Sequence, residues 1–203
     1  MKIETIIFDL GGVLVDWNPE YVFLKEFNGD RKKMKWFFNN ICTNKWNEQQ
    51  DGGKLIKDAT KERIKLYPKY EKQIKMYYGR WEEMLRGEIS KSVEILNTLY
   101  KNNYNLIALT NWSAETFPVA LERFSFLKLF NGIVVSGEIK MLKPFPEIYL
   151  YTLNKYKLNP EKCIFIDDRL SNVKGAEKCG ISGIKFDDHV GLIRNLKKLG
   201  VEI

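Results

Sequence analysis

Residues 3–12 run Ile3-Glu4-Thr5-Ile6-Ile7-Phe8-Asp9-Leu10-Gly11-Gly12. An apolar, β-rich run that stops at an Asp and a pair of glycines is typical of a buried strand followed by a turn. The apolar residues are nearly continuous instead of alternating, as expected for a strand that is covered on both faces. We therefore expect the carboxylate of Asp9 at the carboxyl end of a buried strand.

Four later segments repeat this form, an apolar strand that ends in polar residues. Helical segments lie between them. This alternation of strand and helix predicts an α/β fold with a Rossmann-like, doubly wound parallel sheet. The helical segments are residues 93–102, 114–127, 147–156, 173–179 and 192–199, and the strands are Leu106–Leu109 before Thr110-Asn111, Gly132–Val135 before Ser136-Gly137, Cys163–Ile166 before Asp167-Asp168, and Gly183–Phe186 before Asp187-Asp188.

One long region, residues 18–86, interrupts the alternation because it holds no convincing strand. Apolar and aromatic residues near its C-terminal end fall at helical spacing. We predict a helical insertion between the first strand and the rest of the sheet. The expected boundaries place residues 17–87 in this insertion and residues 1–16 and 88–203 in the core.

The chain has 203 residues, of which 44% are hydrophobic, so it can bury a core and does not have a disordered composition. No apolar run approaches the roughly 20 residues of a membrane-spanning helix, and residues 1–8 are too short for a secretory signal. Together with three widely spaced cysteines, these features predict a cytoplasmic protein whose thiols are small buried groups. The single histidine, His189, excludes a histidine-rich metal site. The cysteines are Cys42, Cys163 and Cys179.

The formal net charge is +7, and the stretch from Lys54 to Arg80 contributes +6 of it, from nine basic and three acidic residues. Such a face attracts phosphorylated substrates or nucleic acid, but it also suits a solvated helix in a lysine-rich protein. The stretch holds four tyrosines, a residue type that stacks on bases in nucleic-acid-binding proteins. We expect most of them to pack within the insertion, so a nucleic-acid partner is not favoured. They are Tyr67, Tyr70, Tyr77 and Tyr78.

Polar residues at the strand ends form the candidate site, because ligands of open α/β sheets bind at the carboxyl ends of the strands. Carboxylate oxygens suit Mg²⁺, and a carboxylate is also a nucleophile that can form an aspartyl-phosphate. A lysine and a hydroxyl stabilise the negative charge of a phosphoryl group. The combination predicts Mg²⁺-dependent phosphoryl transfer, although each residue alone also suits a turn or a helix cap. The residues are Asp9, Thr110, Lys143, Asp167 and Asp168.

Four segments, in this order and spacing, resemble the four motifs of the haloacid dehalogenase-like (HAD) hydrolase superfamily. The resemblance spans nearly the whole chain, and the predicted insertion falls where that family carries its cap domain. The segments are Phe8–Leu14, Leu109–Asn111, Lys143-Pro144 and Ile166–Asn172.

The resemblance implies a magnesium-dependent phosphatase that acts on a small phosphorylated metabolite through an aspartyl-phosphate. Asp9 would be the nucleophile, Thr110 would hydrogen-bond the phosphoryl group, and Lys143 would bridge the phosphate and the nucleophile. Thr110, Asn111 and Lys143 are the expected substrate-binding residues. Oligomeric state is not readable from the sequence.

The resemblance also implies the residues that hold the metal. Asp9, the backbone carbonyl of Gly11 and Asp168 would be direct ligands of Mg²⁺, and Asp167 would act mainly through a water molecule. Asn172 lies four residues after Asp168, and we expect it to orient that carboxylate from the next helical turn.

One position departs from the pattern. Phosphatases of this superfamily usually carry a second aspartate, the general acid and base, where this chain has Gly11. That group is typically worth about 10²- to 10⁴-fold in rate. Glycine at this position resembles a branch that includes sugar-phosphate phosphatases related to the phosphatase domain of soluble epoxide hydrolase. Asp16 or a water could replace the acid, although Asp16 also suits a structural role at the turn into residues 17–19.

The missing acid predicts a rate that depends steeply on leaving-group acidity, which favours aryl, acyl and glycosyl phosphates. Two other functions stay open: a 2-haloacid dehalogenase, which needs no Mg²⁺, and a phosphate-binding regulatory module that turns over slowly. The insertion shapes the pocket in this fold, but its sequence does not name a substrate. Trp17, Trp46, Asn47 and Gln50 could reach the leaving group, although the two tryptophans suit packing in the core or hinge at least as well.

Overall fold

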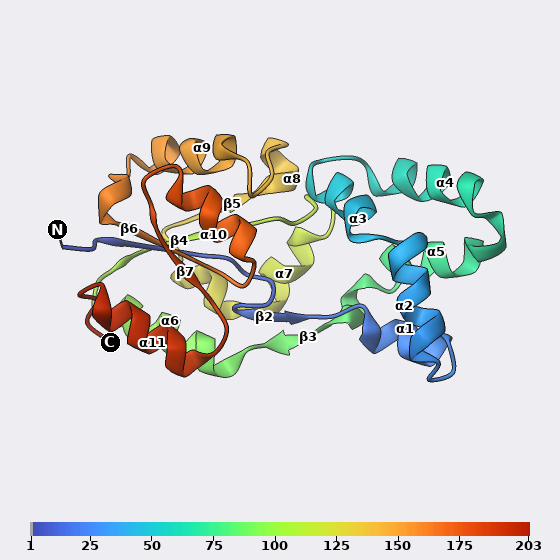
Figure 1. Ribbon diagram of the computed structural model, residues 1–203, viewed down its shortest axis with the longest axis horizontal. Helices are drawn as coiled ribbons and strands as arrows, with labels where there is room; N and C mark the ends of the chain where they lie inside the picture. The colour runs from blue at the N-terminus through green and yellow to red at the C-terminus, as the bar shows by residue number, and fades with distance from the viewer. Residues whose placement is uncertain (1) are drawn as a thin grey trace.

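The computed structural model describes residues 2–203. Its centre is a five-stranded sheet in the order β5-β4-β1-β6-β7, and every neighbouring pair is parallel (Figure 1). This arrangement confirms the predicted doubly wound α/β fold. The strands are β1 (Thr5–Phe8), β4 (Asn105–Thr110), β5 (Gly132–Val135), β6 (Cys163–Asp167) and β7 (Ser182–Lys185).

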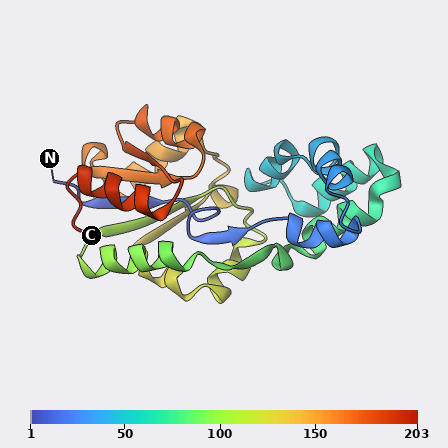
Figure 2. The same cartoon turned by 60° about the horizontal axis from the view of Figure 1, so that its bottom comes forward.

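Helices cover both faces of the sheet, which explains why its strands are continuously apolar. All four residues of β1 are buried, and their side chains alternate between two packing layers. Ile6 and Phe8 pack in the layer of α6 (Ser90–Lys101) and α11 (His189–Lys198), whereas Ile7 packs against α9 (Pro146–Tyr156) and α10 (Leu170–Glu177). Figures 1 and 2 show these two helical layers on opposite sides of the sheet. The remaining core helices are α7 (Phe117–Arg123), η3 (Ser125–Leu129), α8 (Ser136–Ile139) and η4 (Pro160–Lys162).

The predicted insertion is helical and lies beside the sheet, at the right of Figure 1. Its interior is aromatic: the rings of Phe23 and Phe37 are 5.3 Å apart, as are those of Trp46 and Tyr77. The tyrosines of the basic stretch pack in or against this cluster, as expected. The helices are α1 (Glu20–Glu26), α2 (Arg31–Asn40), α3 (Asn44–Asp51), α4 (Ile56–Leu66), η1 (Pro68–Tyr70), α5 (Glu71–Gly79) and η2 (Trp81–Met84).

A short antiparallel ribbon, which the sequence did not indicate, joins the insertion to the core. It consists of β2 (Val15–Trp17) and β3 (Leu85–Glu88). β3 contains a glycine and two charged residues in four positions, so it carries no strand pattern. The expected boundaries at residues 17 and 87 fall in this ribbon, and the division into two domains stays a prediction.

The thiols agree with the expectation of small packed groups. All three cysteines are free, Cys42 and Cys163 are buried, and Cys179 is partly buried. His189 contacts the buried Ser92, with 3.1 Å between its Nε2 and the Ser92 Oγ. Over the described range of 2–203, no helix combines the length and apolarity that crossing a bilayer requires.

Candidate active site

The strand ends meet at one edge of the sheet, as the sequence predicts. Phe8 pairs with Ala108 of β4 and with Ile166 of β6, so Asp9 follows β1 beside the end of each neighbouring strand. The Asp9 main-chain N–H donates to the carbonyl of Ile166 at 2.9 Å, which holds the turn against β6. A pocket of about 380 Å³ opens at this edge, and Asp9 and Thr110 are among its lining residues.

Lys143 links the nucleophile position to the end of β6. Its ammonium lies 2.9 Å from Asp9 Oδ1 and 2.7 Å from Asp167 Oδ2, and it donates to the Leu109 carbonyl at 2.9 Å. The lysine is only 3% exposed, so these contacts act where water screens them weakly. Lys143 is therefore placed to hold Asp9 in one orientation.

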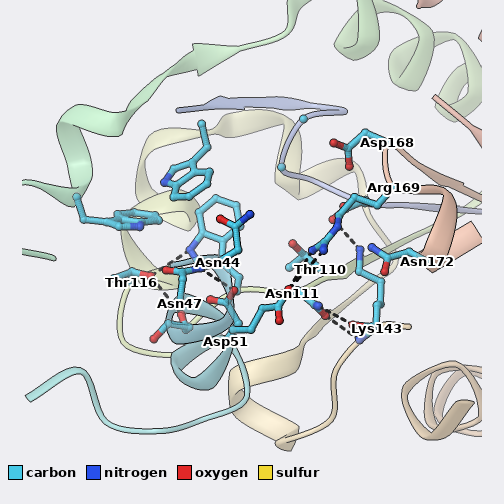
Figure 3. A pocket seen from close by; sticks show the side chains of 18 of the residues that line it. Asn44, Asn47, Asp51, Thr110, Asn111, Thr116, Lys143, Asp168, Arg169 and Asn172 are labelled. Atoms are coloured by element: carbon cyan, nitrogen blue, oxygen red, sulfur yellow. Dashed lines mark hydrogen bonds and ion pairs between the residues drawn. The ribbon is translucent and has the colours of Figure 1, made fainter. Parts of the chain in front are cut away.

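Asn111 contacts Lys143 with both ends of its side-chain amide. Its Nδ2 donates to the Lys143 carbonyl at 3.0 Å, and its Oδ1 accepts from the Lys143 main-chain N–H at 2.9 Å. Asn111 lines the pocket, but this pair of hydrogen bonds occupies the amide (Figure 3). Substrate binding by Asn111 stays a prediction, and the structure gives it a contact that positions Lys143.

Asp167 is fully buried and has a partner for each oxygen. Besides Lys143, it accepts from the Arg169 main-chain N–H at 2.8 Å and from Asn172 Nδ2 at 3.0 Å. We expected Asn172 to orient Asp168, but its amide donates to both oxygens of Asp167. Because α10 begins at Leu170, Asn172 lies in its first turn and faces the end of β6.

Asp168 completes a group of three carboxylates with Asp9 and Asp167. One oxygen from each lies within 4.8 Å of the others. Gly12 allows this approach: its φ is +76°, and a Cβ there would lie 2.8 Å from Asp168 Oδ2. The second glycine of the turn is therefore required both by backbone conformation and by contact with a carboxylate.

The charges at this edge are unbalanced. Burial raises the pKa of Asp9 to about 8 although Lys143 opposes it, and burial together with Asp167 raises the pKa of Asp168. Burial lowers the pKa of Lys143, but Asp167 and Asp9 raise it above its usual range, so the lysine stays charged. With all three carboxyls ionised, the three carboxylates and the ammonium carry a formal charge of −2, which a divalent cation would neutralise. The oxygen donors also suit a hard ion, so the residues fit Mg²⁺.

Gly11 lines the pocket without a side chain. A Cβ built there meets nothing within 4 Å, so the place that a side chain at this position would take is open space. Asp16 takes part in a contact away from the pocket lining: both of its oxygens accept from the Tyr21 hydroxyl, at 2.9 and 2.8 Å.

The opposite wall of the pocket comes from the insertion (Figure 3). Four polar residues of α3 line it at the spacing of one helix face, and this spacing is visible in the sequence. Trp17 and Asn47 line the pocket as expected, whereas Trp46 and Gln50 are buried inside the insertion. The α3 residues are Asn44, Asn47, Glu48 and Asp51, and the aromatic lining residues are Trp17, Tyr78, Trp81 and Trp112.

Comparison with known proteins agrees with this geometry. A family model described as haloacid dehalogenase-like hydrolase matches residues 6–186. The chain belongs to this family. It is therefore a HAD-family hydrolase, and all four motif segments lie within the matched range.

Relatives of this HAD hydrolase include phosphatases. A sesquiterpene phosphatase of Aspergillus oryzae is 27% identical over 97% of this chain and 96% of the relative. A phosphorylated carbohydrates phosphatase of Thermotoga maritima is 25% identical over 90% of this chain and 84% of the relative. A HAD family enzyme of Bacteroides thetaiotaomicron, crystallised as a magnesium complex, is 25% identical with a TM-score of 0.73, covering 96% of this chain and 100% of that one. The chain is thus a phosphatase-like hydrolase of the family.

Proposed function

We propose that this HAD hydrolase is a magnesium-dependent phosphatase of small phosphorylated metabolites, with Asp9 as the nucleophile. The carrying observation is the contact of Lys143 with both Asp9 and Asp167, beside a third carboxylate and an open pocket. A buried ammonium on the nucleophile and unbalanced acidic oxygens suit transfer of a dianionic group in the presence of a cation.

In this proposal, Asp9 attacks phosphorus and forms an aspartyl-phosphate, which water then hydrolyses. The Asp9 Oδ1 accepts from the Leu10 main-chain N–H at 2.7 Å as well as from Lys143, so the carboxylate is held by two donors. Thr110 is 1% exposed and ends β4 beside them, where its hydroxyl can donate to the phosphoryl oxygens. Asn111 supports Lys143 through the main chain.

Asp9, Asp168 and the carbonyl of Gly11 would hold Mg²⁺, with Asp167 contributing through water. When bound, the ion would supply positive charge to the phosphoryl oxygens and favour the ionised form of Asp9. Asp167 also positions neighbouring groups, because its oxygens bind Lys143, Asn172 and the Arg169 main chain.

Residues 17–87 would act as the cap that selects the leaving group. The pocket wall that they contribute combines amides, carboxylates and aromatic rings, which suits a molecule with hydroxyls and an apolar face. The phosphorylated carbohydrates phosphatase among the relatives supports a sugar phosphate as the substrate.

A screen of sugar phosphates, nucleotides and other phosphometabolites with Mg²⁺ tests the proposal. We expect turnover that EDTA abolishes and that Asp9→Asn lowers by about 10⁴-fold or more, because the nucleophile is lost. Asp187→Asn is the matched control, since Asp187 also follows a strand but is exposed and paired with Lys185.

Each alternative function has its own outcome in this screen. Dehalogenation of a 2-haloacid that persists in EDTA would identify a dehalogenase. Binding of phosphate without turnover, equal in the parent protein and the Asp9→Asn variant, would identify a regulatory module. Either result would replace the phosphatase proposal.

A further inference from the structure

The pocket contains carboxylates beyond those that the proposed phosphatase reaction already uses. Asp9 and Asp168 lie on the sheet edge, whereas Glu48 and Asp51 reach the pocket from α3. The side chain of Glu48 is 39% exposed and is paired with Arg169 at 3.4 Å. Asp51 is partly buried and has no ion pair within 4.0 Å among the described residues.

Asp51 is fixed to the core by its own main chain. The Ser136 Oγ donates to the Asp51 carbonyl at 2.6 Å, and the same oxygen accepts from the Trp112 main-chain N–H at 2.9 Å. Trp112 lies two residues after Thr110, so the loop that leaves β4 and the end of α3 share one hydroxyl. This contact holds the last residue of α3 at the edge of the sheet that carries Asp9.

The carboxyl group of Asp51 is also held in place. Asn47 Nδ2, one helical turn earlier, donates to Asp51 Oδ2 at 3.0 Å, and Figure 3 shows both residues at the same pocket as Lys143. The second oxygen has no side-chain partner within hydrogen-bond distance in the described part of the chain. With Asn47 as a side-chain donor and the Ser113 main-chain N–H as a further one, the carboxyl still has an oxygen that can exchange a proton with a group in the pocket.

The surroundings of Asp51 raise its pKa to near neutral pH, so that both the protonated and the ionised form are populated there. Burial raises the pKa of Asp51 to about 7 and Glu48 adds to the rise, while the Ser113 main-chain N–H, Arg169 and Lys143 oppose it. Lys143 also contacts Asp9 directly. Tyr77 and Tyr78 of α5 also face Asp51; burial raises the pKa of each, and Asp51 adds to the rise, so both stay neutral.

We propose that Asp51 is the acid–base residue of this enzyme, acting from the insertion in place of the aspartate that Gly11 lacks. This inference rests on the proposed phosphatase function. As Asp9 Oδ bonds to phosphorus and the ester P–O bond breaks, Asp51 gives its proton to the leaving oxygen. In the second step, Asp51 takes a proton from the attacking water while the bond from phosphorus to Asp9 breaks. Phosphate leaves, and Asp51 is again protonated.

The sequence alone predicts a rate that depends steeply on the leaving group, because it shows no acid. An acid at Asp51 reverses this prediction. With Asp51 as acid, the parent enzyme depends weakly on the leaving-group pKa, and the steep dependence appears in Asp51→Asn. We expect this variant to lose about 10²-fold in kcat/KM for an alkyl phosphate such as a hexose 6-phosphate, and less than about fivefold for p-nitrophenyl phosphate. The plot of log kcat/KM against leaving-group pKa should steepen accordingly.

The pH profile gives a second readout that a purely structural role would not change. For the alkyl substrate, kcat/KM of the parent enzyme should fall as the pH rises above about 7, because Asp51 must start protonated. Asp51→Asn should lack this limb, and Asp51→Glu should keep it. Asp58→Asn, an exposed aspartate of the same insertion, is the matched control for both measurements.

A rescue experiment completes the test. A Cβ at Gly11 meets no atom within 4 Å, so an aspartate fits there. Adding Gly11→Asp to the Asp51→Asn variant should therefore raise its activity on the alkyl phosphate about tenfold. Equal losses for all leaving groups, or an unchanged basic limb in Asp51→Asn, would overturn the role of Asp51. Activity that survives Asp9→Asn would instead overturn the proposed function, so the two failures are distinct.

Discussion

The two walls of the pocket are built in different ways. The sheet edge, formed by Asp9, Thr110, Lys143 and the Asp167-Asp168 pair, holds itself together by charge, since one buried ammonium contacts two carboxylates from different strands. The α3 wall combines hydrogen bonds of neutral groups, such as the one from the Tyr78 hydroxyl to Asn47 at 2.9 Å, with a partly exposed ion pair between Glu48 and Arg169. Removing one charge disturbs every partner at the sheet edge, whereas a change on α3 stays local. We therefore expect substitutions at the sheet edge to cause large losses of activity and stability, and substitutions on α3 to affect only particular substrates or pH ranges.

The largest effect beyond loss of the nucleophile should follow Lys143→Met. Activity should fall about 10³-fold, because the phosphoryl group loses a preorganised cation. The free energy of unfolding should fall by about 3 kcal/mol at pH 8, since two buried carboxylates lose their partner. Urea unfolding in EDTA measures this change in the free energy of unfolding without any contribution from bound metal.

The pH dependence of that loss distinguishes charge from packing. Without the ammonium, which opposes the rise in the pKa of Asp9, that pKa should rise further, so the Asp9 carboxyl is protonated at pH 5 and the destabilisation shrinks there. The same loss at both pH values would mean that Lys143 stabilises the fold through its alkyl chain. Lys185→Met removes a surface pair with Asp187 and should change stability by less than about 0.5 kcal/mol.

The sheet edge could be predicted from the sequence because strand ends of a parallel sheet converge wherever they lie in the chain. Asp9, Thr110 and Asp167 each follow an apolar run, so their meeting depends only on the sheet being parallel. The sequence pattern does not predict in the same way which neighbour a side chain faces. Asn172 faces Asp167 instead of Asp168 because of where the first turn of α10 begins.

The insertion was harder to predict beyond its helical nature. Its aromatic residues divide between a buried cluster and the pocket, and sequence periodicity alone does not separate the two. Trp46 is buried while Tyr78 lines the pocket, because packing against α4 and the core decides which face of each helix is covered. The position of Asp51 in the pocket was not predicted either. Asp51 precedes Gly52 and Gly53, which favour a turn, whereas the structure includes it as the last residue of α3, on the face that lines the pocket.

Asn111→Ala should have an intermediate effect and decides between two roles. If Asn111 positions Lys143, as its two hydrogen bonds indicate, kcat should fall about 30-fold with little change in KM. If it binds substrate directly, KM should rise while kcat is nearly unchanged. Steady-state kinetics on one good substrate separates these outcomes, and Asn97→Ala, in the helix α6 that contributes no lining residue to this pocket, serves as a control.

The smallest effect should be a gain in stability, and it comes from the α3 wall. The folded pKa of Asp51, about 7, lies above its ordinary value of 3.8, so folding favours the protonated form. Stability is therefore fully present below about pH 4, declines as the pH rises towards 7, and stays reduced above it. Asp51→Asn removes this penalty and should stabilise the protein by about 1 kcal/mol at pH 8, with no gain near pH 4. Thermal unfolding across that range measures the difference. A variant that is destabilised at every pH would show that the Asp51 carboxylate stabilises the contact between α3 and the sheet, and the contrast between the two walls would then be wrong.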